Sequence, residues 1–203
     1  MKLLYSPTSP YARKVRIVAA EKRIEMEMVA VVLTAPDCPV NEHNPLGKIP
    51  VLIMDDGDSL FDSRVIVEYL DNRTPLAHLI PQEQGKKIWV RRWEALADGV
   101  CDAAVAVRTE IRRPTHMQDA DMIERQMGKV SRGLELISHD LGTGKWCVND
   151  TFSLADIALG CVLGFLELRF KEIDWQQQYP NLAEHYAKLM KRTSFKETAP
   201  PVG

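Results

Sequence analysis

The sequence lacks a long hydrophobic run, which argues against a segment that crosses a membrane. Its most apolar stretch, residues 154–168, contains Asp156 and Glu167. This stretch is also shorter than the roughly 20 apolar residues that a transmembrane helix needs. We therefore predict a buried helix here. The first residues likewise lack a basic segment followed by an apolar one, so a secretory signal peptide is not expected.

Neither sign of charge dominates the chain. Its 26 basic and 28 acidic residues are interspersed and give a net charge of −2, so nothing requires a nucleic acid or an anionic membrane as partner. With 203 residues, the chain is long enough to bury a core in one or two domains. These properties agree with a soluble cytoplasmic enzyme, and neither a nucleic acid nor a membrane is expected as a partner.

The four cysteines do not form a C-x-x-C pair, and they have no metal-like spacing with the five histidines. We therefore expect neither a thioredoxin-type dithiol nor a zinc site, and we assign no metal. Free thiols in a reducing compartment are expected instead. Cys101 and Cys161 lie on apolar helical patterns that predict core packing, whereas Cys38 lies in a loop that could expose it.

A loop followed by a short apolar run surrounds Pro50. Residues 44–48 contain a proline and a glycine, and residues 51–54 have the composition of a strand. Proline is tolerated at the start of a strand or at a sheet edge. If the Ile49-Pro50 bond is cis, the backbone N–H and C=O of Ile49 turn outward unpaired. An extended peptide could then pair with them.

A predicted helix begins at Ser63, directly after a predicted hairpin. Asp56-Gly57 between two short strands is a strong hairpin signal, and apolar residues after Ser63 recur at helical spacing. The free N–H groups and the dipole of a helix N-terminus can bind a carboxylate. The alternative is that Asp62 or Ser63 only caps the helix. The neighbouring peptide-binding edge at Pro50 favours the binding site.

The first residues are predicted to form a strand, a turn and a helix. Residues 2–6 are typical of a strand, and Ser9 precedes a helix with Pro10 at its first position. A second strand over residues 26–32 gives the order β-α-β, followed by β-β-α, within about the first 74 residues.

The rest of the chain is predicted to be helical. Proline and glycine interrupt the periodicity before residue 86, so we predict domains over residues 1–76 and 86–203 with a linker over residues 77–85. Ser153 and Asp156 form a variant of the capping box at the start of the buried helix, which is a folding element and not a catalytic pair. Three further helices are predicted over residues 86–112, 119–141 and 179–192.

Three short motifs follow one another in the N-terminal part: Ser9-Pro10-Tyr11, Lys48-Ile49-Pro50 and Asp62-Ser63. In order and spacing they resemble the active-site serine, the cis-proline loop and the acidic-Ser pair of bacterial-type glutathione S-transferases. The resemblance covers nearly the whole chain. It implies an α/β thioredoxin-like N-terminal domain, an all-α C-terminal domain, and a detoxifying enzyme that uses glutathione as co-substrate and needs no cofactor.

The resemblance also assigns roles in binding glutathione, which is γ-Glu-Cys-Gly. Ser63 would hold the γ-glutamyl carboxylate and Asp62 its ammonium group. The backbone of Ile49, before Pro50, would pair with the cysteinyl unit, and Lys48 would hold the glycyl carboxylate.

Ser9 is the predicted catalytic residue, since its hydroxyl could donate a hydrogen bond to the glutathione thiol. Thr8 and Ser6 are alternatives, and Ser9 could also merely cap the first helix. A serine at this position provides no enzyme thiol, which disfavours a mixed-disulfide mechanism. Conjugation, isomerisation and reduction of disulfides or peroxides all remain open.

A pocket for a small electrophilic co-substrate is expected near Tyr11, Arg108, Arg112 and the region of Trp175. Two arginines would suit an anionic co-substrate, although they could equally face solvent.

The resemblance further implies a homodimer. The predicted stripe bearing Trp89, Trp93 and Val100 offers more apolar surface than one helix needs. In such a dimer Asp98 would lie near the glutathione bound by the partner, or it could be an exposed helix residue. A different class of protein, a non-catalytic binding module like the stringent starvation regulators, is the alternative to an enzyme.

Overall fold

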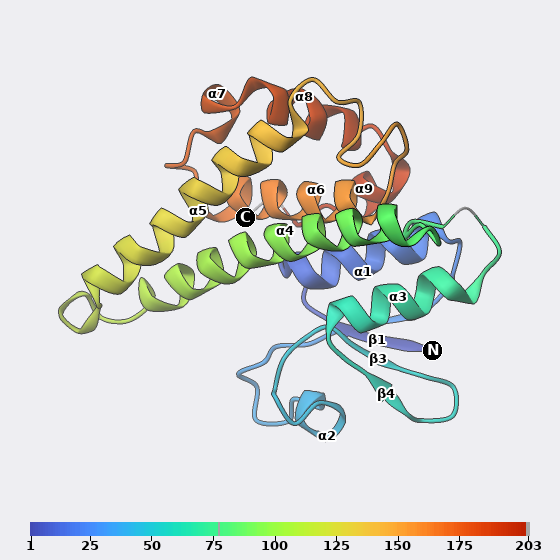
Figure 1. Cartoon of the computed structure of the whole chain (residues 1–203). Coiled ribbons are helices and arrows are strands. Elements are labelled where there is room, and N and C mark those ends of the chain that lie inside the picture. Colours follow the sequence, from blue (N-terminus) through green and yellow to red (C-terminus); the bar gives the residue numbers. More distant parts are fainter. Residues whose placement is uncertain (77, 202–203) are drawn as a thin grey trace. The chain divides into compact units, whose positions relative to one another are not determined.

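The computed structural model describes residues 1–76 and 78–201, which form two compact units (Figure 1). The first unit joins Met1–Ile80 to the C-terminal residues from Lys191 onward, and the second comprises Pro81–Met190. Residue 77, inside the predicted linker, lies outside the described residues.

The first unit contains a four-stranded mixed sheet in the order β2-β1-β3-β4. The strand β1 pairs with β2 in parallel and with β3 in antiparallel orientation, and β3 pairs with β4 in antiparallel orientation. The strands β1, β2 and β3 are each shorter than their predicted ranges. The bounds of the strands are Lys2–Tyr5 for β1, Glu27–Ala30 for β2, Val51–Ile53 for β3 and Ser59–Leu60 for β4.

The predicted hairpin between β3 and β4 is confirmed. Gly57 has φ +93°, a left-handed conformation that favours glycine. The N–H of Met54 donates to the carbonyl of Asp58 at 2.8 Å, and the N–H of Gly57 donates to that of Met54 at 3.1 Å. The Asp-Gly signal thus predicted the turn from local conformational preference alone.

Helices α1 (Pro10–Glu21) and α3 (Ser63–Arg73) pack against each other (Figure 1). Both were predicted, and α1 begins with Pro10 at its first turn as expected. The short helix α2 (Val40–His43) was not predicted, because four residues are too few to establish a helical period.

A buried ion pair fixes the chain after α3. The Nζ of Lys22, fully buried, lies 3.3 Å from Oδ1 of Asp71. Lys22 also donates to the carbonyls of Thr74 and Leu76, while Asp71 accepts the backbone N–H groups of residues 79 and 80. Both charges are therefore hydrogen-bonded as well as paired, which is the condition under which buried charges are tolerated.

The C-terminal segment belongs to the first unit, although its residues were predicted to be part of the helical domain. The helix α9 (Thr193–Glu197) packs on α1. Arg192 donates to both carboxylate oxygens of Glu21 at 2.9 and 2.6 Å, and the hydroxyl of Ser194 donates to the same group at 2.5 Å.

The second unit is all helical, as predicted. The long helices α4 (Gln84–Glu110) and α5 (Ala120–Leu141) pack against each other (Figure 1), and a Cβ added at Gly133 would lie 2.3 Å from Val100. Glycine at this position therefore permits the close approach of the two helices. A 3-10 turn, Thr115–Met117, lies between them in sequence.

The buried helix predicted near residues 154–168 is α6 (Leu154–Arg169), which packs along α4. Two shorter helices follow, α7 (Trp175–Gln178) and α8 (Pro180–Leu189). The prediction of one helix up to residue 192 was therefore wrong at its end. Within the described part of the chain, none of the helices is long and apolar enough to cross a membrane.

One residue of the apolar stripe predicted on α4 lies outside the core. Trp93 is 3 % exposed, whereas Trp89 is 55 % exposed, with the guanidinium of Arg92 at 5.5 Å from its ring centroid. The neighbouring Ile88 is 65 % exposed. The helix thus presents apolar surface that the second unit itself does not bury.

Candidate functional site

The strand register brings three predicted site segments to one end of the sheet. Leu4, near the end of β1, lies opposite Val51 at the start of β3. Leu52 in turn lies opposite Leu60 at the end of β4. The three segments that leave the sheet at this end are residues 6–9, 48–50 and 61–63.

Ser9 caps α1 and still has a proton to donate. Its Oγ accepts the N–H of Ala12 at 3.2 Å, and its own N–H donates to the carbonyl of Ser6 at 3.1 Å. Among the described residues, the Ser9 hydroxyl donates no hydrogen bond. A hydroxyl can accept at a lone pair and donate its proton at the same time, so capping and donation to a ligand are compatible.

Ser6 and Thr8, the two alternatives to Ser9, are within hydrogen-bonding distance of each other. The hydroxyls of Ser6 and Thr8 lie 3.4 Å apart, with either able to donate. Only one of these two hydroxyls uses its proton in this contact and the other keeps it, so the choice among Ser6, Thr8 and Ser9 remains a prediction.

The loop before β3 is held by a buried asparagine. Asn44, 2 % exposed, donates from Nδ2 to the carbonyl of Lys48 at 2.8 Å and accepts the N–H of Leu46 at 3.0 Å. Gly47 has φ +62°, which only glycine adopts readily. The side chain of Lys48 is exposed to solvent, so its ammonium is available to an anion.

The Ile49-Pro50 peptide bond is cis, as the sequence analysis considered. In the part of the chain that the structure describes, the N–H and C=O of Ile49 take part in no backbone hydrogen bond, whereas Val51 is paired with Leu4. An unpaired donor and acceptor on one residue, next to a paired strand, is the arrangement that an extended peptide can join.

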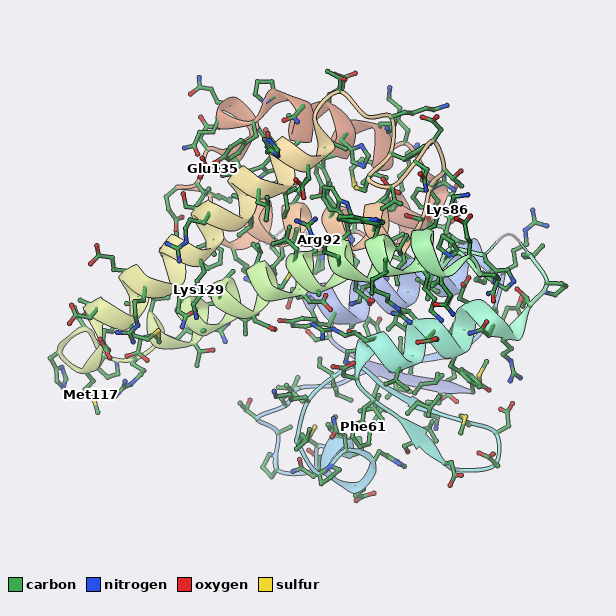
Figure 2. The ribbon with its side chains drawn as sticks, in the orientation of Figure 1. Phe61, Lys86, Arg92, Met117, Lys129 and Glu135 are labelled. Atoms are coloured by element: carbon green, nitrogen blue, oxygen red, sulfur yellow. The ribbon has the colours of Figure 1, made fainter. Side chains whose placement is uncertain are left out.

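Asp62 and Ser63 have different roles at the start of α3. The Oδ1 of Asp62 accepts the N–H of Arg64 at 2.9 Å, so Asp62 is the N-cap. Ser63 is the first residue of the helix and is 3 % exposed, and neither its N–H nor its hydroxyl has a partner among the described residues. Phe61, labelled in Figure 2, precedes them through a cis peptide bond. Asp62 is therefore the residue that caps the helix, whereas the N–H and the hydroxyl of Ser63 can still bind a ligand.

The arginines expected near a second substrate lie at the end of α4. Arg108 is half-buried in its last turn, and Arg112 follows the helix and is exposed. A third arginine, Arg169 in the last turn of α6, was not anticipated from the sequence. Burial lowers the pKa of the Arg169 guanidinium, and the positive charges of Arg108 and Arg112 lower it further. Arg108 and Arg112 are therefore near enough to Arg169 to act on it electrostatically.

Trp175 and Tyr11 were also expected near the second substrate. Trp175 is 2 % exposed, and its ring packs edge-on against Tyr186 at 5.7 Å, so it belongs to the core of the second unit. Tyr11 lies in α1, in the first unit, where it has an interaction of its own. The grouping of Tyr11 with the arginines remains a prediction.

Asp98 is not an exposed helix residue, so that alternative was wrong. Its exposed fraction is 5 %, and it already has an interaction within the chain. Its contribution to a ligand of a partner chain remains a prediction.

A cluster of Cys147, Asp156 and His185 was missed by the sequence analysis. One potential ligand atom from each residue lies within 4.8 Å of the others. The cluster was missed because its members come from three separate segments, and no local spacing connects them.

The chemistry of this cluster is that of a packed structural element. Asp156 already accepts the N–H groups of Cys147 and Ser153, each at 2.9 Å, and lies 3.1 Å from Nε2 of His185. Burial raises the pKa of the Cys147 thiol, and the negative charge of Asp156 raises it further. In the absence of a metal, these surroundings keep the thiol protonated, while the buried Nε2 of His185 has no hydrogen-bond partner among the described residues.

The same residues confirm the predicted capping box. The Ser153 hydroxyl accepts the N–H of Ala155 at 3.3 Å, while Asp156 accepts the N–H of Ser153. The two residues that could have been mistaken for a catalytic pair thus start the buried helix α6.

Comparison with known proteins identifies related domains in both parts of the chain. Residues 3–78 match the family model described as the glutathione S-transferase N-terminal domain, and residues 120–188 match the one described as the C-terminal domain. The chain is 37 % identical over 201 residues to YibF of Escherichia coli K12, an uncharacterized GST-like protein, with 99 % of each chain covered.

Two solved structures are also similar over almost their full length. A glutathione S-transferase of Methylobacillus flagellatus KT with bound GSH is 70 % identical, with a TM-score of 0.97 and coverage of 98 % of this chain and 99 % of that chain. A glutathione transferase family member of Pseudomonas fluorescens Pf-5 with bound S-(propanoic acid)-glutathione is 33 % identical, with a TM-score of 0.88 and the same coverage.

Proposed function

This chain belongs to the glutathione S-transferase superfamily, with a thioredoxin-like N-terminal domain and a helical C-terminal domain, and on that premise we propose that it binds reduced glutathione and activates its thiol. The activated thiol is transferred to a small electrophile. The relative from Methylobacillus flagellatus with bound GSH supports the first part of this proposal.

The observation that carries the proposal is the convergence of open polar groups at one end of the sheet. Ser9, Ile49 and Ser63 each retain a donor or acceptor without a partner among the described residues, and they come from three segments that the register brings together. Buried or half-buried polar groups are normally paired. A polar peptide ligand would pair all three.

The groups suit the three parts of glutathione. The N–H and hydroxyl of Ser63, at the positive end of α3, would bind the γ-glutamyl carboxylate, and the remaining carboxylate oxygen of Asp62 would accept from its ammonium group. The N–H and C=O of Ile49, before Pro50, would pair with the cysteinyl backbone. Lys48 would attract the glycyl carboxylate as an exposed cation.

Ser9 would activate the thiol by donating its free proton to the sulfur. A thiol has a reference pKa of about 8.5, so only a few per cent is thiolate at neutral pH. A hydrogen bond to a charged group contributes roughly 1.5 to 3 kcal/mol, which corresponds to about 1 to 2 pKa units. This shift makes the thiolate a major species near neutral pH.

Conjugation is the reaction class that fits best. Because Ser9 provides no thiol, a mixed disulfide with the enzyme cannot form at that position. The relative from Pseudomonas fluorescens binds S-(propanoic acid)-glutathione, in which the sulfur carries a carbon substituent. An adduct of this kind is the product expected from transfer of glutathione to a carbon electrophile.

A twofold homodimer is part of the proposal. Ile88 and Trp89 are 65 % and 55 % exposed, and contiguous exposed apolar surface commonly marks an interface. Twofold pairs are the commonest closed assemblies. Sedimentation equilibrium at micromolar concentration should give the mass of two chains, and a monomer would remove the dimer, and the contribution of Asp98 to a partner's ligand, from the account.

Calorimetric titration with reduced glutathione tests the binding site. In Ser63→Ala the helix N–H remains but the hydroxyl is lost, so we expect binding about tenfold weaker than in the wild type. The control is Ser131→Ala, which removes an exposed serine from α5 and should leave the affinity unchanged. Unchanged affinity in Ser63→Ala would exclude its hydroxyl as a carboxylate receptor. If the wild type fails to bind glutathione, the result favours the alternative of a non-catalytic binding module.

A further inference from the structure

Three potential metal ligands meet inside the second unit, where α6 begins. Cys147 comes from the segment before this helix, Asp156 from its first turn and His185 from α8. One ligand atom of each residue lies within 4.8 Å of the others. All three residues belong to Pro81–Met190, so their arrangement does not depend on the first unit. Cys147 is half-buried and follows the exposed residues 142–145, which puts the cluster near the surface.

The buried imidazole of His185 indicates a ligand that the chain itself does not supply. Its side chain is only 2 % exposed, yet Nε2 has no hydrogen-bond partner in the described part of the chain. This atom lies 3.1 Å from Oδ1 of Asp156, but the two do not form a hydrogen bond, because their alignment is unsuitable. Buried polar groups are normally paired. A cation held by the imidazole and the carboxylate would pair both atoms.

The separations of the ligand atoms are close to those of a zinc site. Zn²⁺ binds nitrogen and oxygen at about 2.0 to 2.2 Å and thiolate sulfur at about 2.3 Å, in tetrahedral geometry. Ligand atoms arranged in this way are about 3.4 to 3.6 Å from one another. The 3.1 Å between Nε2 of His185 and Oδ1 of Asp156 is near this range, so small side-chain adjustments are sufficient.

The carboxylate of Asp156 can bind a metal and still start α6. Its two oxygens accept the N–H groups of Cys147 and Ser153, each at 2.9 Å. A carboxylate has about four lone-pair sites, so further sites remain on both oxygens. Hydrogen bonds of this kind orient a metal-binding carboxylate. One of them also positions the backbone of Cys147, the second potential ligand.

We propose that Cys147, Asp156 and His185 bind a divalent transition-metal ion of the zinc type, which stabilises the second unit. Thiolate and imidazole ligands select such ions, whereas Mg²⁺ and Ca²⁺ prefer oxygen ligands. On binding, the thiol of Cys147 releases its proton to solvent, and the sulfur donates an electron pair to the metal. The ion connects α6 and α8 with the segment before α6. This inference revises the expectation from the sequence, which assigned no zinc site, and it is independent of glutathione binding.

The ammonium group of Lys188 is a nearby positive charge that opposes a bound cation. It lies 4.0 Å from the centroid of the Trp146 ring and donates to the carbonyl of Lys145. It also acts electrostatically on both Cys147 and Asp156. The variant Lys188→Gln removes this charge and should therefore bind Zn²⁺ a few-fold more tightly than the wild type at low salt. Weaker binding by this variant would count against a cation at this place.

Cobalt substitution tests the sulfur ligand in the full-length protein, after metals are removed with a chelator and the thiols are reduced. Co²⁺ occupies sites of the zinc type, and a thiolate ligand gives it a charge-transfer absorption band in the near ultraviolet. One equivalent of Co²⁺ should produce this band in the wild type, and Zn²⁺ should then displace the cobalt and remove the band. The band should be absent in Cys147→Ser. It should remain in the control Cys38→Ser, which removes the loop thiol.

Calorimetric titration with Zn²⁺ tests the imidazole ligand. His185→Phe removes the nitrogen atoms but keeps an aromatic ring against Trp146, whose ring centroid lies 5.9 Å from that of His185. Changes to partners outside the ligand shell already weaken metal binding by about 10- to 100-fold, so loss of a ligand should weaken it by about a hundredfold or more. The control His116→Phe removes an exposed imidazole and should bind Zn²⁺ like the wild type.

Thermal unfolding measures the stabilisation. Zn²⁺ at about a hundredfold above its Kd should raise the Tm of the wild type by about 5 to 10 °C relative to the same protein with chelator. His185→Phe should show no such rise. Because each variant is compared with itself, a lower stability of the metal-free variant does not affect the result.

Failure of the wild type to bind Zn²⁺ would overturn the inference. A cobalt–thiolate band that persists in Cys147→Ser, or equal Zn²⁺ affinity of the wild type and His185→Phe, would overturn it as well. If Cys147→Ser does not fold, the band of the wild type and the affinity of His185→Phe still decide. Each of these outcomes leaves the proposed binding of glutathione unaffected.

Discussion

Replacing Asp156 with alanine should destabilise the second unit strongly. The side chain is 0 % exposed and joins the start of α6 to the segment before it. It accepts the N–H groups of Cys147 and Ser153, each at 2.9 Å, and the Ser153 hydroxyl lies at 3.3 Å. His185 is also close, with Nε2 at 3.1 Å from Oδ1.

The size of the effect follows from the donors left behind. Asp156→Ala leaves two backbone N–H groups in the interior, and an unsatisfied buried donor costs about 1 to 3 kcal/mol. The free energy of unfolding should therefore fall by roughly 2 to 6 kcal/mol. For a chain of this size, each kcal/mol lowers Tm by about 2 to 4 °C, so a drop of around 10 °C is expected.

Urea unfolding and thermal scans of three variants measure this. Ser153→Ala removes only the hydroxyl cap and should cost about 1 kcal/mol. Asp150→Ala removes an exposed carboxylate nearby and should stay within about 0.5 kcal/mol of the wild type. A loss below about 1 kcal/mol in Asp156→Ala would refute the reasoning, because two unsatisfied buried donors cannot cost so little.

Two further predictions concern titration. Burial alone would raise the pKa of Glu21, but hydrogen bonds from Arg192 and a neighbouring serine outweigh it, so the pKa lies below its usual value. A depressed carboxyl pKa stabilises the fold above the unfolded pKa, and this stabilisation is lost as pH falls through the folded pKa. The protection factors of amides in the C-terminal segment should therefore fall below about pH 4, and less so in Glu21→Gln; equal acid dependence in both would contradict this. Burial and then a nearby carboxylate raise the pKa of the Cys147 thiol, so iodoacetamide should label it more slowly than Cys38 in the native protein, and equal rates by mass spectrometry would oppose that view.

Features that depend on local signals were predictable from the sequence. The cap at Ser9, the Asp-Gly hairpin and the Ser153 capping box each require residues only a few positions apart. The short helices α2 and α7 were not predicted, since neither is long enough to show a helical period.

Contacts between residues far apart in the sequence could not be predicted from the sequence alone. The ion pair between Glu21 and Arg192, which holds the C-terminal segment on α1, connects residues 171 positions apart. The nearness of Arg169 to Arg108 and Arg112 likewise depends on the packing of α6 on α4, which joins segments far apart in the sequence. The candidate site was proposed from the order of its three motifs and from the open backbone groups expected at Ile49. That Asp62, and not Ser63, caps α3 required the structure.

The central claim is that Ser9 activates the thiol of bound glutathione. Thiolate absorbance at the ultraviolet edge, followed against pH in the complex, measures this directly. We expect a thiol pKa about 1 to 2 units lower in the wild type than in Ser9→Ala. Asp119→Ala, which removes the comparable N-cap of α5, should titrate like the wild type. Superimposable titrations of wild type and Ser9→Ala would contradict the claim and transfer the role to Thr8 or to backbone donors.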